Sequence, residues 1–211
     1  MPQIKLQDIN IEYQEFIPEI NNYETIIFMH GRGCNLLSWF QQIPYFSKKY
    51  RCVVYSQRGF GHSYDLPDGP GWSSFPNDLK GVMDNLNIKQ AHLVAQSMGG
   101  VSALGFAVNN PERVLSITFA DTTGGMGEPE LEREMIKWKE NNPRTRGRFE
   151  AISEIFEKQN PEMANLYFQI GLSNPELTNP DMSLSKINLL GGPSGDQLKA
   201  LTMPVLFIVG E

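Results

Sequence analysis

Five short, nearly continuous apolar runs constrain the fold of this chain more than any other feature of its sequence. They read TIIFM (25–29), CVVY (52–55), AHLVA (91–95), VLSITFA (114–120) and PVLFIV (204–209). A strand that is apolar on both faces must be covered on both sides, as in a parallel sheet flanked by helices. The sequence therefore predicts a doubly wound, mostly parallel α/β fold.

The segments around these runs fit the same architecture. Apolar residues first occupy alternate positions, as expected of an antiparallel hairpin, at Ile4 and Leu6 and then at Ile9, Ile11 and Tyr13. Asp8 lies where the hairpin turns. Helices are expected over 36–48, 74–86 and 98–109, and Pro111 ends the last of them.

A long interval separates the fourth apolar run from the fifth. It spans roughly 80 residues, far more than an ordinary connection between strands. Helix-forming sequence fills most of it, over 128–142, 147–160 and 161–172, and a turn-rich stretch follows over 172–186. We interpret the interval as an inserted helical lid. The predicted division is a core over 1–123, a lid over 124–200 and the start of a carboxy-terminal core part over 201–211.

Composition excludes several classes of protein. A net charge of -6 disfavours nucleic-acid binding, which requires a basic face. No segment resembles a signal peptide or a membrane span, so a cytoplasmic protein without a membrane partner is expected. Cys34 and Cys52 are too few for a disulfide framework. No metal-ligand spacing or nucleotide fingerprint is present, so neither metal nor cofactor is expected, and nothing indicates the oligomeric state.

The stretch AQSMGG (95–100) places Ser97 between a predicted strand and a predicted helix. Small residues at Ala95 and Gly99 let the strand and the helix approach closely. In such a nucleophile elbow the serine has a strained backbone and projects its hydroxyl above the sheet. The pattern predicts Ser97 as a catalytic nucleophile, and the alternative is an ordinary helix N-cap.

Two backbone N–H groups are candidates for an oxyanion hole. The Met98 N–H lies at the amino end of the helix, where free N–H groups and the helix dipole favour negative charge. The Arg32 N–H lies in the turn after His30, which Gly31 and Gly33 allow to run close to the substrate. For the His30 side chain we favour a hydrogen bond that holds this turn.

Four stretches, in order, resemble landmarks of the α/β-hydrolase superfamily. They are HGRG (30–33), QRGFGHS (57–63), AQSMGG (95–100) and PVLFIVGE (204–211). The resemblance is to the lid-bearing, cofactor-free, esterase-like branch with a serine nucleophile, and it implies the α/β-hydrolase fold. A serine at position 97 disfavours the haloalkane dehalogenases and epoxide hydrolases, which use aspartate there. An aspartate commonly precedes QRGFGHS, whereas this chain has Ser56.

The resemblance also implies a triad in the order serine, acid, histidine. The acid normally follows the strand that PVLFIVGE matches, and the histidine lies beyond one further strand. The chain ends at Glu211, so the sequence is expected to be truncated before both, without the last strand and helix. Some superfamily members place the acid where Asp121 follows VLSITFA, which makes Asp121 an alternative acid.

The three histidines of the chain are poor candidates for the base. His92 begins the strand that leads to Ser97, roughly 16 Å from it at the opposite edge of the sheet. His30 lies beside the oxyanion turn, and GFGHS around His62 is first of all a turn. The leading hypothesis is a serine hydrolase of a small ester or related carbonyl substrate, inactive as this chain. The alternative is a non-catalytic binding protein or truncated paralogue of the same fold.

Overall fold

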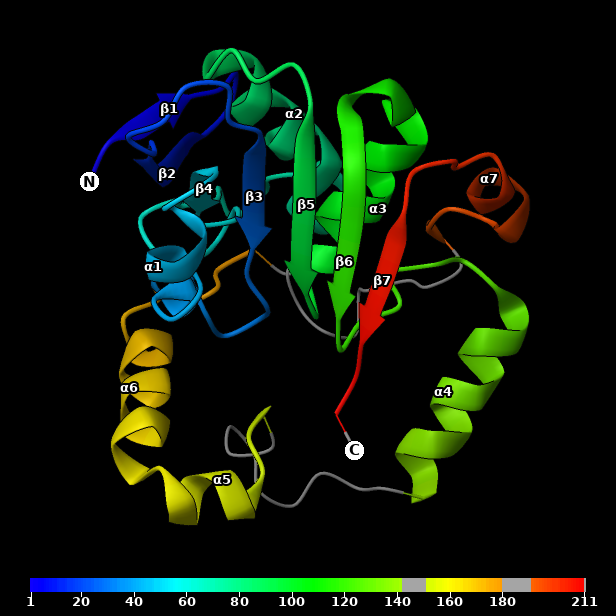
Figure 1. Cartoon of the computed structure of the whole chain (residues 1–211). Helices are drawn as coiled ribbons and strands as arrows, with labels where there is room; N and C mark the ends of the chain where they lie inside the picture. Colours follow the sequence, from blue (N-terminus) through cyan, green and yellow to red (C-terminus); the bar gives the residue numbers. More distant parts are fainter. Residues whose placement is uncertain (142–150, 180–190, 211) are drawn as a thin grey trace.

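The computed structural model describes residues 1–141, 151–179 and 191–210. Within these residues the chain forms a seven-stranded sheet of order β1-β2-β4-β3-β5-β6-β7 (Figure 1). The strands are β1 (Gln3–Lys5), β2 (Asn10–Phe16), β3 (Thr25–Met29), β4 (Arg51–Tyr55), β5 (Ala91–Gln96), β6 (Val114–Ala120) and β7 (Val205–Ile208). β1 and β2 form an antiparallel hairpin, and β2 pairs antiparallel with β4. All remaining pairs are parallel.

The mostly parallel α/β fold and the amino-terminal hairpin are therefore confirmed. The two faces of the sheet have separate apolar cores because alternate side chains of a strand point to opposite faces. In β3, Ile27 and Met29 pack in the core under α2 (Phe75–Asn85) and α3 (Gly99–Asn109). Ile26 and Phe28 pack on the other face, where α1 (Ile43–Phe46) lies (Figure 1). β3 and β4 are buried along almost their whole length, as their nearly continuous apolar sequence requires.

The predicted single helix over 36–48 is wrong. The segment forms the 3-10 helix η1 (Leu36–Trp39) and then the one-turn helix α1 (Ile43–Phe46). Pro44 has no N–H, and its ring would collide with the carbonyl of Phe40 in a continuous helix. The second predicted helix consists of η2 (Gly71–Ser74) followed by α2, and the third is α3, with η3 (Pro111–Arg113) after it.

Helical segments lie beyond the carboxyl ends of the parallel strands (Figure 1). They are α4 (Pro129–Asn141), α5 (Glu154–Gln159) and α6 (Pro161–Leu172), and α7 (Gly195–Lys199) precedes β7. Parts of the predicted 147–160 helix and of the turn-rich 172–186 stretch lie outside the described residues. The lid and its boundaries stay a prediction. In the part of the chain that the structure describes, no helix is both long and apolar enough to cross a membrane.

β7 is an exposed, apolar sheet edge, whereas its continuous apolar sequence predicts a strand covered on both faces. It pairs only with β6 among the described strands, and its four side chains are 44–56% exposed. Phe207 stacks on Phe119 of β6, with ring centroids 5.3 Å apart. An uncharged edge strand whose outer backbone groups have no partner strand favours non-specific association with other chains.

We expect Leu206→Lys to reduce concentration-dependent association of the chain, because a charge on an edge strand opposes edge-to-edge pairing. Leu206 is 55% exposed, so the free energy of unfolding should change by less than about 0.5 kcal/mol. Sedimentation velocity over a range of concentrations measures the effect. Leu37→Lys is the control, since Leu37 is also exposed but lies in η1. An equal effect of both variants would contradict an edge-specific mechanism.

Candidate active site

Ser97 occupies a sharp turn between β5 and α3. Its φ is +49°, in the left-handed region that non-glycine residues rarely adopt, so the predicted backbone strain is confirmed. Its N–H donates to the Ala120 carbonyl at 2.9 Å, and its carbonyl accepts from the Gly100 N–H at 3.0 Å. The N-cap position of α3 is Met98, not Ser97, and no side chain caps it. The ordinary N-cap alternative for Ser97 is therefore wrong.

Gly99 allows the turn to pack directly on the neighbouring strand. A Cβ atom at Gly99 would lie 2.3 Å from the carbonyl oxygen of Met29, which is backbone and cannot move aside easily. Ala95 is fully buried on the strand before the turn. The requirement for small residues at positions 95 and 99 thus has a direct steric cause. Whether Ser97 is the nucleophile stays a proposal.

The two predicted oxyanion donors lie in the segments that follow the adjacent strands β3 and β5. Met29 pairs with Ala95 in the parallel register of β3 and β5, so the loops that follow leave the sheet side by side. The first N–H groups of an α-helix have no partner within the helix, and Met98 precedes α3 directly. The loop Gly31–Cys34 closes through a hydrogen bond from the Cys34 N–H to the Gly31 carbonyl, at 3.2 Å. Gly33 has φ +81°, and the Arg32 side chain is exposed.

His30 supports this loop from inside the protein. Its ring is fully buried, and Nε2 accepts from the Gln57 N–H at 2.9 Å. Nδ1 therefore carries the proton and donates to the Gly31 carbonyl, at 2.8 Å. The hydrogen-bonding role predicted for His30 is confirmed, and its buried side chain cannot itself contact a substrate. The Gln57 side chain donates to the His30 carbonyl and accepts from Ser102 Oγ on α3.

Burial lowers the pKa of His30 from 6.5 to about 4, against a smaller opposing effect of its bond to Gly31. A depressed pKa means that protonation favours the unfolded chain. His30 should therefore contribute stability that is complete above pH 6.5 and lost as the pH falls to about 4, on the order of 3 kcal/mol. Urea unfolding across this range, compared between the parent and His30→Gln, isolates the contribution. An imidazole that titrates near pH 6.5 in the folded protein would contradict it.

A buried carboxylate that the sequence did not reveal supports the turn around His62. Glu12 on β2 accepts from Ser56 Oγ at 3.0 Å, from the His62 N–H at 3.0 Å and from His62 Nδ1 at 2.6 Å. Burial opposes the charge, yet the hydrogen bonds from His62 and Ser56 hold the pKa of Glu12 below its usual value. Glu12 thus supplies a carboxylate beside Ser56, where the family pattern has an aspartate.

The side-chain hydrogen bonds of the three histidines go to groups other than Ser97. His30 is buried with both nitrogens bonded, and His62 Nδ1 is paired with Glu12 on β2. His92, at the start of β5, contacts Ser116 Oγ at 2.8 Å and Glu24 at 3.2 Å. The predicted exclusion of His92 is confirmed by its place at the opposite end of the strand.

Asp121 lies beside the elbow, directly after the Ala120 carbonyl that Ser97 contacts. It also has positive φ, +49°, and its side chain is exposed. Its Oδ1 accepts from the Gly210 N–H at 3.0 Å, which ties the end of β6 to the residues after β7. The position suits an acid near Ser97, but among the described residues the histidines are hydrogen-bonded to groups other than Asp121.

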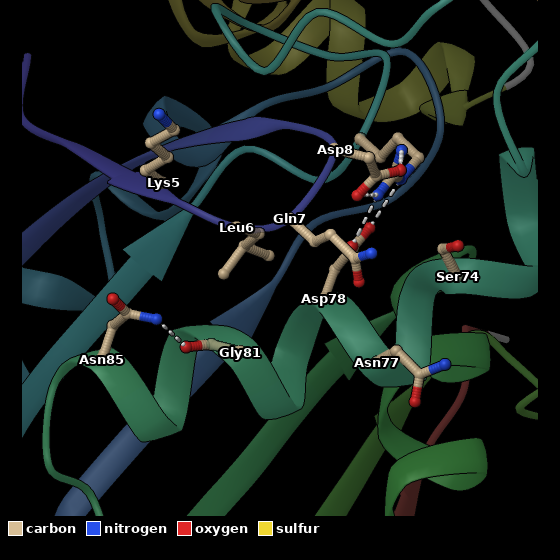
Figure 2. A pocket seen from close by; sticks show the side chains of 10 residues that line it. Lys5, Leu6, Gln7, Asp8, Ser74, Asn77, Asp78, Gly81 and Asn85 are labelled. Atoms are coloured by element: carbon tan, nitrogen blue, oxygen red, sulfur yellow. Dashed lines mark hydrogen bonds and ion pairs between the residues drawn. The ribbon is translucent and has the colours of Figure 1, made fainter.

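The hollow in Figure 2 is separate from the elbow. It has a volume of about 640 Å³ and lies between the β1–β2 hairpin and α2. None of its lining residues comes from the elbow or from the Gly31–Cys34 loop. Asp8 and Asp78 meet there around the guanidinium of Arg58, which donates to both and to Asp65. Its donors are satisfied by these carboxylates, which identifies a structural ion cluster.

Comparison with known proteins gives a consistent result. A family model described as alpha/beta hydrolase fold matches residues 24–185. 3-Oxoadipate enol-lactonase 2 of Acinetobacter baylyi is 35% identical over 123 residues, which cover 58% of this chain and 45% of the lactonase. A 2-hydroxy-6-oxononadienedioate/2-hydroxy-6-oxononatrienedioate hydrolase of a Pseudomonas species is 29% identical over 207 residues, or 90% of this chain and 72% of that hydrolase. The match thus spans less than half of the first relative's length.

Solved structures share the fold over the whole chain. An enol-lactonase from Burkholderia xenovorans LB400 has a TM-score of 0.76 at 20% identity, with 99% of this chain and 81% of that chain covered. Est816, described as an N-acyl homoserine lactone degrading enzyme, has a TM-score of 0.77 at 22% identity, with 100% and 82% covered. At these identities the likeness concerns the fold alone.

Proposed function

The chain belongs to the α/β-hydrolase fold family, and from this membership we propose that it is a serine hydrolase of small esters, lactones or related carbonyl compounds. The observation that carries the proposal is the backbone of Ser97. A serine with φ +49° between a buried parallel strand and the amino end of an eleven-residue helix projects its hydroxyl where that helix stabilises negative charge.

In the proposed reaction, Ser97 Oγ attacks the substrate carbonyl carbon and loses its proton to a base. The N–H groups of Met98 and Arg32 stabilise the negative oxygen of the tetrahedral intermediate. Collapse of the intermediate breaks the bond to the leaving group and forms an acyl-serine, and water then releases the acid. His30, Gly31 and Gly33 act by shaping the loop that carries the Arg32 N–H.

We infer that the general base comes from outside these 211 residues. The inference is supported by the three histidines of the chain, whose side-chain hydrogen bonds go to groups other than Ser97. The same external segment would supply the acid, with Asp121 as the alternative. Without a base, this chain alone should turn over esters negligibly.

The substrate class follows from the elbow and its surroundings. Phe60, Trp72, Phe75 and Met98 form a buried apolar cluster at the elbow, which favours an acyl group with an apolar part. The relatives named above include lactonases and a hydrolase of an oxo-dienedioate, so the proposal extends to lactones and to other activated carbonyl compounds. Helices α4–α6 would exclude water from the bound substrate.

Labelling by a fluorophosphonate tests the proposal. We expect slow phosphonylation of Ser97 that accelerates with added imidazole, which can replace the missing base, and none in Ser97→Ala. Peptide mass analysis locates the label. Modification of a different serine, with Ser97 unlabelled, would overturn the proposal.

One observation favours a second candidate, a non-catalytic binding protein of the same fold. All three histidines form side-chain hydrogen bonds to groups other than Ser97, so no histidine base is bonded to the elbow serine in the described part of the chain. A binding protein needs the pocket but not the reactive hydroxyl. It therefore predicts no phosphonylation of Ser97 at any imidazole concentration.

A further inference from the structure

A short segment after α6 binds the loop that carries the predicted oxyanion donor. It comprises residues 173–179 and is called the return segment here. A Cβ atom at Gly171, in the last turn of α6, would lie 2.8 Å from the Gly33 carbonyl oxygen. The end of α6 therefore already touches the Gly31–Cys34 loop, and the return segment continues along it.

Asn174 joins three parts of the molecule through one side-chain amide. Its Oδ1 accepts from the Gly61 N–H at 2.9 Å, and this backbone donor fixes which end of the amide is oxygen. The amide nitrogen therefore faces the Cys34 carbonyl and donates to it at 3.2 Å. Asn174 thus connects the loop before η1, the turn around His62 and the end of α6.

Asn35 completes the connection from the other side. It is buried, and its Oδ1 accepts from the Leu37 N–H at 3.0 Å, which directs its Nδ2 toward the return segment. Nδ2 lies 2.9 Å from Ser173 Oγ and 3.2 Å from Asn174 Oδ1. The two amides therefore form one hydrogen-bonded unit on the loop that begins at Gly31.

The return segment also contacts the apolar cluster to which the Met98 side chain belongs. Leu177 packs against the apolar cluster of Phe60, Trp72, Phe75 and Met98. Asn179 anchors the far end by donating to Asp65 Oδ2 at 2.7 Å and to the Gly69 carbonyl at 2.9 Å. The return segment thus contacts both the Gly31–Cys34 loop and the apolar cluster that includes Met98.

We propose that Asn174 is a positioning residue for acyl transfer at Ser97, because its amide fixes the Gly31–Cys34 loop and hence the Arg32 N–H. The inference rests on the proposed function. Asn174 touches no reacting atom and acts through the Cys34 carbonyl. A loop that carries glycines at positions 31 and 33 needs such a restraint, since glycine leaves its backbone many conformations.

The Ser97→Cys variant of the full chain makes this testable without a general base, because a thiolate is nucleophilic by itself. p-Nitrophenyl acetate transfers its acetyl group to the thiolate: the carbon–sulfur bond forms, the ester bond breaks, and p-nitrophenolate leaves. Iodoacetamide alkylates the same thiolate by displacement of iodide, with no oxyanion. The ratio of the acylation rate to the alkylation rate therefore reports the oxyanion hole.

Asn174→Asp is the informative change. Aspartate keeps the shape and the acceptor for the Gly61 N–H but loses the donor to the Cys34 carbonyl. In the Ser97→Cys chain we expect it to lower the acylation-to-alkylation ratio by about tenfold to a hundredfold, because a misplacement of about 1 Å can cost about a hundredfold, with alkylation itself unchanged. Asn174→Ser also removes the hydrogen bond to the Cys34 carbonyl and should lower the ratio similarly. It serves as the second variant if Asn174→Asp does not fold.

Asn179→Ala is the matched control, because it loosens the return segment at Asp65 and Gly69 rather than at the loop. It should lower thermal stability and leave the ratio unchanged. If the Ser97→Cys chain has a higher acylation-to-alkylation ratio than the urea-unfolded chain, and neither Asn174 variant lowers that ratio, the inference about Asn174 is overturned and the proposed function is not. A Ser97→Cys chain whose ratio equals that of the urea-unfolded chain would instead overturn the proposed function.

Discussion

Replacement of Arg58 by methionine is expected to lower the free energy of unfolding at pH 7 by about 3–5 kcal/mol. The Arg58 side chain is only 1% exposed, and it pairs with Asp8, Asp65 and Asp78 at 2.8–3.0 Å. Methionine fills similar space but leaves the carboxylates of Asp65 and Asp78 buried without a cation. An uncompensated buried charge costs much more than the ion pair contributed.

The loss should depend on pH. Burial already raises the pKa of Asp78 above its usual value, although hydrogen bonds from Arg58 oppose the shift. Removal of Arg58 raises that pKa further, and protonation then relieves the buried charge. A raised folded-state pKa makes the folded protein bind a proton more readily than the unfolded chain, so the stability deficit of Arg58→Met is largest at pH 7 and shrinks toward pH 5.

Urea unfolding at both pH values measures the deficit. Lys80→Met is the control, since Lys80 pairs with Asp84 at the surface and both side chains are nearly half exposed. Its removal should cost less than about 1 kcal/mol at either pH. A deficit for Arg58→Met as small as that of the control would contradict a buried ion cluster.

Most of the fold could be predicted because the decisive pattern is local. The parallel strands of the core each coincide with a nearly continuous apolar run, and β3 and β6 have the predicted bounds. The error at 36–48 has an equally local cause that was overlooked, since Pro44 prevents a continuous helix. The apolar pattern of 36–48 favours a helix, but Pro44 interrupts it, and two short helices form instead.

The elbow was predictable for the same reason, since the strand end, Ser97 and the helix start are consecutive. The hydrogen bonds that support the site could not be predicted from the sequence. Glu12 contacts Ser56 because β2 pairs with β4, and the periodicity of one strand does not predict which strand it pairs with. Asn174 contacts Cys34 across 140 positions of the chain. Such contacts depend on tertiary packing, where a residue type alone carries little information.

Ser56, which stands where the family pattern has an aspartate, illustrates the difference between what the sequence and the structure can show. The family pattern marked the missing aspartate as a departure, but the sequence could not show its consequence. In the structure, the Glu12 carboxylate accepts hydrogen bonds from Ser56 and from the backbone and ring of His62. A negative charge is therefore retained beside the turn, although it comes from a different strand.

The central claim is that position 97 holds a nucleophile at a preformed oxyanion hole, and Ser97→Cys tests it without a base. A thiol at the amino end of α3 should have a lowered pKa and react readily. Cys34 and Cys52 should not compete. Burial raises the pKa of Cys34, and it raises that of Cys52 to about 11.

The most direct measurement is the ratio of acylation by p-nitrophenyl acetate to alkylation by iodoacetamide for the Ser97→Cys chain, folded and unfolded in urea. Each oxyanion donor contributes about a hundredfold or more to acyl transfer, so the folded chain should exceed the unfolded chain by at least about a hundredfold. One acetyl group per chain should be found at position 97. An equal ratio in both states, or acetylation elsewhere, would contradict the assignment of Ser97.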